Sequence, residues 1–179
     1  MRYEGKLYRA LNPIYARELL SGSGVELYRG RFNPKGMPAI YTSLSALTAL
    51  REAGQIGHRR PTTLVTYDAL FERIFDSRDK DALNAEGMDA DALADPSWRD
   101  EMKESGEART QRFASRLSAA GYHGLLVRSF APGASDDDLN LVLWRWSKTP
   151  PARLSVIDDE NRPTTLKSAE SGFIHPIDR

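Results

Sequence analysis

An arginine in a glycine-containing loop is the first candidate for chemistry in this sequence. Arg31 lies in the segment RGRFNPKGMP at residues 29–38. Glycine lets a backbone approach a ligand closely, and a guanidinium can bind a phosphate through two parallel hydrogen bonds. Arg31 could therefore bind a phosphate, or it could satisfy carbonyl groups of its own loop. Arg9, in the segment YRA, could add a second phosphate contact or could be a charge at a strand edge.

Three further polar residues stand in or at the ends of expected strands. Tyr41, in AIYTS, offers a flat ring that could stack on a heterocycle, although a strand tyrosine more often belongs to the core. Ser129 closes an apolar strand just before a Pro/Gly loop, and Asn140 begins the next strand. Each of these residues alone is a weak signal, and their order along the chain gives them weight.

The helix expected over residues 45–53 has an apolar side and a polar side. On a helical wheel the apolar side consists of Leu47, Leu50 and Ala53. The polar stripe opposite consists of Ser45, Thr48 and Glu52. A solvent-exposed position is therefore the default expectation for Glu52.

Several familiar chemistries have no matching motif. The sequence contains no P-loop, no G-x-G-x-x-G after a strand and no G-x-S-x-G, which argues against the corresponding nucleotide-binding and hydrolase folds. The three histidines are far apart and outside any ligand-spaced motif, so we expect no metal. Asp136–Asp138 resembles a cation site but is interpreted as a solvated turn. Three tryptophans are expected in the core or at an interface: Trp98, Trp144 and Trp146.

Length and composition indicate one domain. The 179 residues suit a single hydrophobic core, and no apolar run approaches the length of a membrane span. Cysteine is absent, which is easiest to reconcile with a reducing compartment, so we expect a cytoplasmic protein. Residues 1–60 hold ten Lys and Arg against four Glu and no Asp, a balance that could attract an anionic ligand. Direct nucleic-acid binding is not expected, because Lys is scarce there and the rest of the chain is acidic.

The expected elements favour the α+β class. Short strands and helices alternate without a regular βαβ rhythm. Strands are expected at residues 6–11, 39–43, 62–67, 124–129 and 139–146, and near 153–157. Helices are expected at residues 13–20, 45–53 and 107–120, the last with Phe113 and Leu117 inward. The acidic segment 68–107 is expected to be irregular with short helical turns.

Taken in order, six segments resemble the RES domain, a family named for its Arg, Glu and Ser. They are YRA (8–10), GRFNPxG (30–36), AIYTS (39–43), ALRE (49–52), Ser129 and NLVL (140–143). The resemblance covers about residues 6–146 of a single domain, 1–179. The least family-like part is the acidic variable segment 68–107, and residues 147–179 form a C-terminal extension. Tyr28-Arg29 is a departure, since a second Gly or a His is expected before Gly30.

The resemblance implies a single domain with the ADP-ribosyltransferase toxin fold, which has a central mixed or antiparallel sheet and flanking helices. It also implies the toxin of a bacterial toxin–antitoxin system, with a dimeric antitoxin of the Xre/helix-turn-helix type covering the active site. Such enzymes consume NAD⁺ as a substrate and cause growth arrest. By position, Arg31, Glu52 and Ser129 would be the catalytic residues. NAD⁺ would be bound by Arg9, Arg31, Tyr41, Ser129 and Asn140.

The acceptor of the ADP-ribose stays open. A mono-ADP-ribosyltransferase would pass ADP-ribose to a protein target, for which the acidic segment could provide a docking surface, and we favour this reading slightly. An NAD⁺ glycohydrolase or phosphorylase would deplete cellular NAD⁺ instead. From another class, a non-catalytic nucleotide- or protein-binding module would use Arg31 for a phosphate and leave Glu52 solvated. A nuclease is disfavoured by the lack of a His pair, a metal cluster or a continuous basic face.

Overall fold

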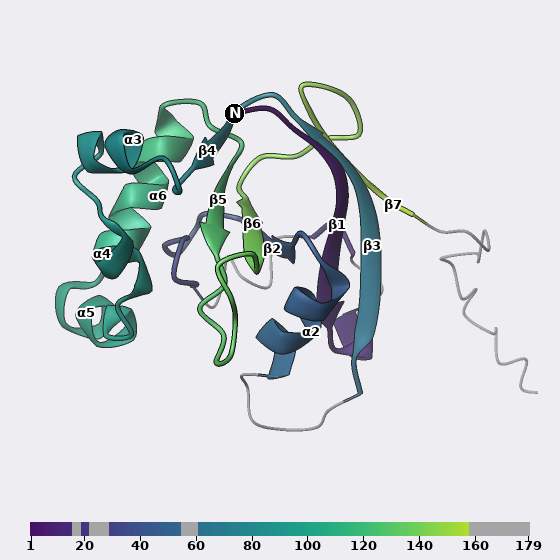
Figure 1. Cartoon of the computed structure of the whole chain (residues 1–179), viewed down its shortest axis with the longest axis horizontal. Coiled ribbons are helices and arrows are strands. Elements are labelled where there is room, and N and C mark those ends of the chain that lie inside the picture. The colour runs from purple at the N-terminus through teal and green to yellow at the C-terminus, as the bar shows by residue number, and fades with distance from the viewer. Residues whose placement is uncertain (16–18, 22–28, 55–60, 158–179) are drawn as a thin grey trace, which may run out of the picture.

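The computed structural model describes residues 1–15, 19–21, 29–54 and 61–157 (Figure 1). Its strands are β1 (Tyr3–Leu11), β2 (Ile40–Ser43), β3 (Thr63–Phe71), β4 (Ile74–Asp76), β5 (Gly124–Arg128), β6 (Leu139–Leu143) and β7 (Ala152–Val156). Its α-helices are α2 (Ala46–Gly54), α3 (Lys80–Ala85), α4 (Ala90–Ala94), α5 (Trp98–Ser105) and α6 (Arg109–Ala119), and Pro13–Tyr15 form a 3₁₀ turn. The expected α+β class is confirmed.

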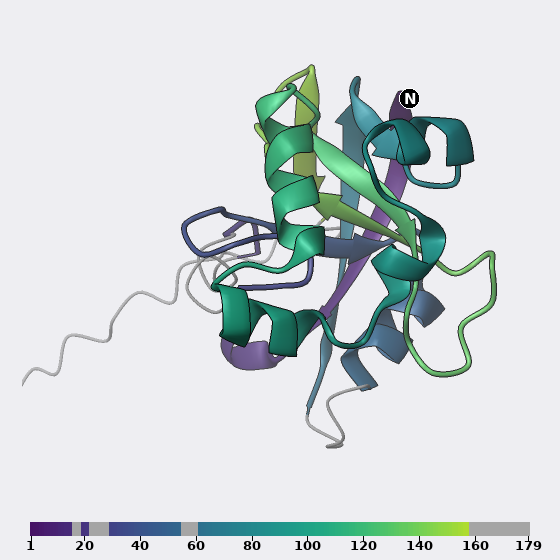
Figure 2. The same cartoon turned by 90° about the vertical axis from the view of Figure 1, so that its left-hand side faces the viewer.

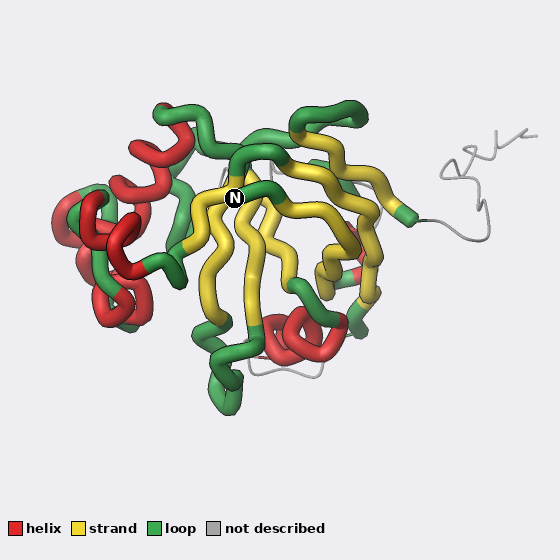
Figure 3. Tube along the Cα trace, turned by 45° about the horizontal axis from the view of Figure 1, so that its top comes forward, coloured by secondary structure: helices red, strands yellow, loops and turns green. Residues whose placement is uncertain are grey.

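Within the described ranges, the strands form one seven-stranded sheet in the order β4-β5-β6-β2-β1-β3-β7. All neighbours are antiparallel except β4 and β5, which are parallel. β1 pairs with β3 along its whole length, from Tyr3↔Phe71 to Leu11↔Thr63, but it shares a single register pair with β2, Tyr8↔Ser43. The sheet is strongly curled (Figure 3), and β1 and β2 separate beyond that one pair.

Two apolar cores lie on the two faces of the sheet. The first fills the inside of the curl and includes Leu7, Ile40, Tyr67, Phe71, Leu126, Leu141 and Leu154. The second lies between the sheet and the helical layer α3–α6 and includes Phe75, Leu93, Phe113, Leu117, Leu125, Val142 and Trp144 (Figures 1 and 2). Helix α2 lies apart from that layer and packs against β1 and β2. Strands β5 and β6 contribute alternate side chains to both cores, which is the consequence of the two-residue period of a strand.

The orientation of α2 reverses the wheel prediction. Thr48 and Ala49 are buried, whereas Leu47 and Leu50 are exposed by 62% and 45%. The reason is that polar partners lie on the sheet side of the helix: Thr48 donates a hydrogen bond to the carboxylate of Asp138 at 2.6 Å. The default expectation that Glu52 faces solvent is therefore wrong, and the apolar side of the wheel is the more exposed one.

The acidic segment is more ordered than expected. It contains the end of β3, strand β4 and helices α3, α4 and α5. Two of its aspartates begin helices: Asp79 accepts a hydrogen bond from the backbone N–H of Ala82, and Asp89 accepts one from that of Ala92. Part of the acidic composition is thus explained by helix capping.

Of the other local expectations, some are confirmed and one is not. Helix α6 and its inward Phe113 and Leu117, both fully buried, are confirmed. Trp98 and Trp144 are buried and Trp146 is partly buried against the first core, as expected. The helix expected at 13–20 is a 3₁₀ turn over its first three residues, and residues 16–18 lie outside the described part. Over the described ranges, no helix has the length and apolarity that a membrane crossing requires.

Candidate active site

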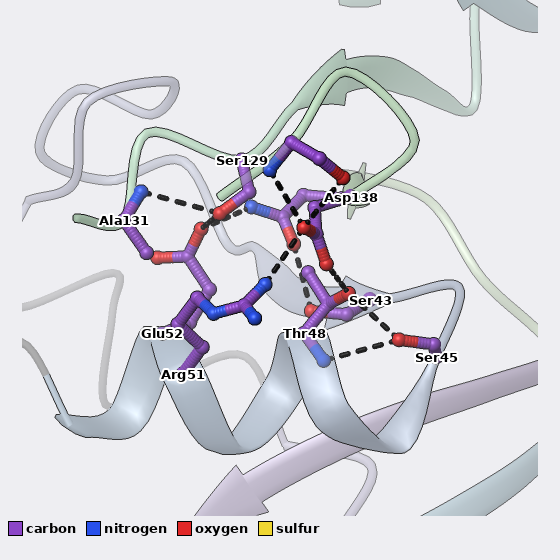
Figure 4. Close-up of polar contacts among 10 residues, drawn as sticks. Ser43, Ser45, Thr48, Arg51, Glu52, Ser129, Ala131 and Asp138 are labelled. Atoms are coloured by element: carbon purple, nitrogen blue, oxygen red, sulfur yellow. Dashed lines mark hydrogen bonds and ion pairs between the residues drawn. The ribbon is translucent and has the colours of Figure 1, made fainter. Parts of the chain in front are cut away.

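The carboxylate of Glu52 is held by two side chains from the far half of the chain (Figure 4). Its Oε1 accepts a hydrogen bond from the Ser129 hydroxyl at 2.6 Å and one from the Asn140 amide at 2.5 Å. Ser43 in turn donates to Oδ1 of Asn140 at 2.7 Å, which fixes the amide with its N–H groups toward Glu52. Glu52 is therefore oriented toward β5 and β6 by a chain of hydrogen bonds.

Ser129 is itself fixed from two directions. Its backbone N–H donates to the carbonyl of Asp138 at 2.7 Å, which continues the β5–β6 pairing by one residue. Its Oγ accepts the backbone N–H of Ala131 at 3.2 Å while its hydroxyl hydrogen is donated to Glu52. The side chain is buried, so the serine acts as a positioned donor for the glutamate.

Three residues missed as site elements by the sequence reading hold α2 in place: Thr48, Arg51 and Asp138. Arg51 donates to Oδ2 of Asp138 at 2.7 Å, beside the Thr48 contact to Oδ1 (Figure 4). Ser135 donates to the same carboxylate from its N–H and its hydroxyl. Hydrogen bonds from Thr48 and Ser135, with the charge of Arg51, lower the pKa of Asp138 to about 2.

Asp138 also corrects the sequence interpretation of Asp136–Asp138 as a solvated turn. Its side chain is only 13% exposed, whereas Asp136, which pairs with Arg128 at 2.6 Å, is 86% exposed. The turn interpretation fits Asp136 and fails for Asp138. Its position next to a strand that carries Asn140 is the one sequence signal that could have singled out Asp138. Across the described residues, no group of three or more His, Asp or Glu is placed to hold a metal ion.

A cavity of about 380 Å³ opens beside Glu52. Its walls are residues 8–10 of β1, residues 41–43 of β2, Ala49, Glu52 and Ala53 of α2, and Asn140 of β6. Continued pairing beyond Tyr8↔Ser43 would have set Arg9 and Ala10 opposite Thr42 and Tyr41. The separation of the two strands therefore makes this cavity, and it places Arg9, Tyr41, Asn140 and Glu52 around one space.

Arg31 is not on that wall but lies close to it. Its Nη1 donates to the carbonyl of Leu93 at 2.6 Å, and its guanidinium carbon lies 4.5 Å from the centre of the Phe130 ring. Burial is the main cause of its lowered pKa, which the neighbouring charge of Arg99 lowers further. Glu52 is among the charges that act in the opposite direction, so the two residues interact electrostatically. The carbonyl that Arg31 binds belongs to helix α4 and not to its own loop, and the binding of a phosphate by Arg31 stays a prediction.

The loop before β2 is fixed by Tyr41. The tyrosine hydroxyl donates to Oδ1 of Asn33 at 2.8 Å and accepts the N–H of Phe32 at 3.0 Å, and burial raises its pKa. A Cβ atom at Gly30 would overlap this hydroxyl and Oδ1 of Asn33, which explains the glycine. Tyr41 is thus one of the residues that line the cavity, and its hydroxyl holds the loop that carries Arg31.

Two more contacts bear on the same loop. Buried Gln111 of α6 donates its amide to the carbonyl of Gly30 at 2.8 Å, and Trp144 donates to the carbonyl of Phe32 at 2.9 Å. Arg29 adopts φ 57°, a left-handed conformation that favours glycine, which gives a physical reason for the glycine expected near this position. Arg29 is tied to the carbonyl of Gly106 at 3.2 Å.

The structure therefore gathers most of the residues singled out from the sequence. Arg9, Tyr41, Glu52 and Asn140 border the cavity, Ser129 binds Glu52 and Arg31 lies close by. In comparisons with known proteins, the model of the RES domain family matched residues 6–166, nearly all of the chain. A search of curated proteins found no match.

Proposed function

Because the chain belongs to the RES domain family, we propose that it is an NAD⁺-consuming enzyme that cleaves the bond between nicotinamide and ribose. The observation that carries the proposal is the carboxylate of Glu52, held by Ser129 and Asn140 at the wall of the cavity. A carboxylate fixed in this way suits a reaction in which positive charge develops on a sugar.

Glu52 has the chemistry that this step requires. Nicotinamide leaves NAD⁺ as a neutral molecule, and the ribose takes on oxocarbenium character as the bond breaks. A carboxylate next to that ribose stabilises the developing charge, as in glycoside cleavage, and can orient the 2′-hydroxyl or the acceptor. Because Ser129 and Asn140 hold Glu52 before substrate arrives, little reorganisation is needed in the transition state.

The other residues of the site are proposed to bind the substrate. Arg9 on the cavity wall and Arg31 nearby supply the positive charge for the phosphates of NAD⁺. Tyr41 lines the cavity, and its ring would pack against the nicotinamide ring. Ser129 would contact the ribose or keep Glu52 oriented, and Asn140 would act alongside it.

A protein side chain is the proposed acceptor of ADP-ribose. A second cavity of about 380 Å³ lies between α3–α4 and the end of β5, with Leu93 and Phe130 in its wall. These two residues also contact Arg31, so the helical acidic segment brings a groove next to the candidate site. Such a groove could receive a protein target, whereas water or phosphate would need none.

Incubation of the purified protein with labelled NAD⁺ and a cell lysate tests both parts of the proposal, the cleavage of NAD⁺ and the transfer of ADP-ribose to a protein. We expect loss of NAD⁺ and one or a few labelled protein bands. Glu52→Gln, which keeps the shape of the side chain and removes its charge, should abolish both. Glu4→Gln, at an exposed ion pair with Arg2 on the first strand, is the matched control and should behave as the wild type. NAD⁺ loss without a labelled band would favour a glycohydrolase or phosphorylase, and turnover by Glu52→Gln at the wild-type rate would refute the assignment.

The resemblance to RES toxins further supports the proposal of a toxin whose partner is an antitoxin of the Xre/helix-turn-helix type. Expression of the chain alone should then arrest growth, and co-expression of the antitoxin should restore it. Growth arrest by the Glu52→Gln variant would show that any toxicity is independent of the proposed chemistry.

A further inference from the structure

We propose that Asp138 is a positioning residue that fixes helix α2 against the β5–β6 end of the sheet and so aligns Glu52 with Ser129 and Asn140. Asp138 lies outside the RES residues and outside the cavity wall. Its contacts are with the elements that carry the site, not with the cavity itself. The catalytic part of this inference rests on the proposed function, whereas the structural part does not.

On the helix side, Asp138 binds two residues of the turn that ends in Glu52. Oδ1 accepts the hydroxyl of Thr48 at 2.6 Å and Oδ2 accepts Nη1 of Arg51 at 2.7 Å. Thr48 and Glu52 are four residues apart, so they lie one above the other on the same face of the helix. Any rotation of α2 that moved Glu52 away from Ser129 would also break the contacts of Asp138.

The direction of these hydrogen bonds is determined by the chemistry. An ionised carboxylate can only accept, so the hydroxyl of Thr48 must donate to Asp138. Ser45, which lies 2.7 Å from the same hydroxyl and accepts the Thr48 N–H at 3.0 Å, must then donate to it. The start of α2 is therefore locked in one pattern of donors and acceptors that ends at Asp138.

On the strand side, the same residue holds Ser129. The backbone carbonyl of Asp138 accepts the Ser129 N–H at 2.7 Å. The carbonyl of the next residue, Leu139, accepts the N–H of Leu44 at 2.9 Å, just before α2, and the residue after that is Asn140. The side chain of Asp138 thus binds the helix that carries Glu52, its backbone binds Ser129, and Asn140 follows two residues later.

The ion pair between Arg51 and Asp138 is more buried than the pair between Arg128 and Asp136 in the same loop. Arg51 and Asp138 are 28% and 13% exposed, whereas Arg128 and Asp136 are 56% and 86% exposed. A solvent-exposed pair holds its partners weakly, while a partly buried pair with additional hydrogen bonds restrains both. Asp136 is therefore a natural control, because it has the same residue type in the same loop but no contact with α2.

The test compares Asp138→Asn with Asp136→Asn in steady-state NAD⁺ turnover. Asp138→Asn should lower kcat by about tenfold or more and leave KM within about twofold, because misplacing a catalytic group acts on the transition state more than on substrate binding. Asp136 lines the second cavity, so turnover is measured without a protein target, and under that condition Asp136→Asn should leave both constants unchanged. Thr48→Val should reproduce part of the loss of kcat, and Thr48→Ser, which retains the hydroxyl, should restore it.

Hydrogen exchange of the α2 amides, measured without NAD⁺, keeps the inference separate from the proposed function. We expect faster exchange in Asp138→Asn than in the wild type and no change in Asp136→Asn. If the wild type fails to consume NAD⁺, the proposed function fails, and unchanged exchange in Asp138→Asn would overturn the positioning role in its own right. A folded Asp138→Asn variant with wild-type kcat would overturn it as well. Should Asp138→Asn not fold, Thr48→Val, which keeps the Arg51–Asp138 pair, gives the same comparison.

Discussion

At the scale of single residues, the side chains of the candidate site hold one another in position by hydrogen bonds before any substrate binds. Ser43 orients Asn140, and Asn140 with Ser129 orients Glu52. Tyr41 lines the cavity while its hydroxyl holds the neighbouring loop. Polar groups placed by such chains have little freedom left to lose when a ligand binds, which favours a preorganised site.

Gly30 is a residue-scale test of this loop. Gly30→Ala should lower the free energy of unfolding by about 1–3 kcal/mol, because the added methyl group meets the Tyr41 hydroxyl and Asn33 and forces one of them to move. Since Arg31 is the next residue, NAD⁺ turnover should fall as well. Urea denaturation and turnover assays measure the two effects.

The matched control is Gly54→Ala at the end of α2, where an added methyl group would meet no atom within 4 Å. That change should leave stability unchanged or raise it by up to about 1 kcal/mol. Equal behaviour of the two variants would mean that the contact between Gly30 and Tyr41 does not constrain the loop.

At the scale of elements, sequence reasoning succeeds where burial follows hydrophobicity and fails where polar partners decide. The periodicity of Phe113 and Leu117 locates α6 and its inward face, because these two side chains pack in the apolar core under the helices. Helix α2 has an equally clear wheel but the opposite orientation. Its polar stripe is drawn inward by Asp138, Ser129 and Asn140, which are between 77 and 90 residues away in the chain.

The residues of the candidate site could likewise be predicted from the sequence only in part. The order of Arg31, Glu52 and Ser129 indicated a family, and the resemblance to that family predicted that the three residues share one site. No local pattern marked Thr48, and Asp138 was marked only by its position just before the strand that carries Asn140. A threonine on a helix and an aspartate in a turn are both typical of solvent-exposed positions. Their contacts exist only once α2 lies against the β5–β6 loop.

The docking of α2 should depend on pH. The pKa of Asp138 is lowered to about 2 in the folded protein by the hydrogen bonds from Thr48 and Ser135 and by Arg51. A lowered pKa means that the ionised side chain stabilises the fold fully above the unfolded-state pKa, about 4, and that this stability is lost as pH falls through the folded-state pKa. The difference in unfolding free energy between the wild type and Asp138→Asn should therefore be constant above about pH 5 and shrink below about pH 4.

Urea denaturation at a series of pH values measures that difference. Asp136→Asn serves as the control and should run parallel to the wild type throughout, since the exposed Arg128–Asp136 pair is expected to contribute little. A gap between the wild type and Asp138→Asn that stayed constant down to about pH 3 would contradict the stabilisation of the ionised form of Asp138.

At the scale of the whole molecule, the α+β class follows from the sequence but the curl of the sheet does not. Strand positions can be recognised from alternation, whereas the order β4-β5-β6-β2-β1-β3-β7 depends on pairings between distant segments. The single register pair between β1 and β2 has no local signature, yet it creates the cavity beside Glu52. The space for a ligand is thus a property of the assembled sheet.

The two cores should nevertheless unfold together. Neighbouring residues of β6 point to opposite faces: Leu141 is fully buried in the core inside the curl, and Val142 is buried under the helical layer. Leu141→Ala should cost about 2–5 kcal/mol and Val142→Ala about 1–3 kcal/mol. Because β5 and β6 belong to both cores, each change should weaken the whole domain and shift one transition.

Far-UV circular dichroism and tryptophan fluorescence give two views of that transition. Trp144 lies in the core under the helices and Trp146 packs against the core inside the curl, so fluorescence senses both faces of the sheet. The denaturation curves from the two methods should coincide for the wild type and for both variants, as a two-state transition requires. Curves that separate in Leu141→Ala but coincide in the wild type would show that the helical layer keeps its structure without the inner core. The sheet would then couple the two cores less tightly than is implied by β5 and β6, the strands that belong to both.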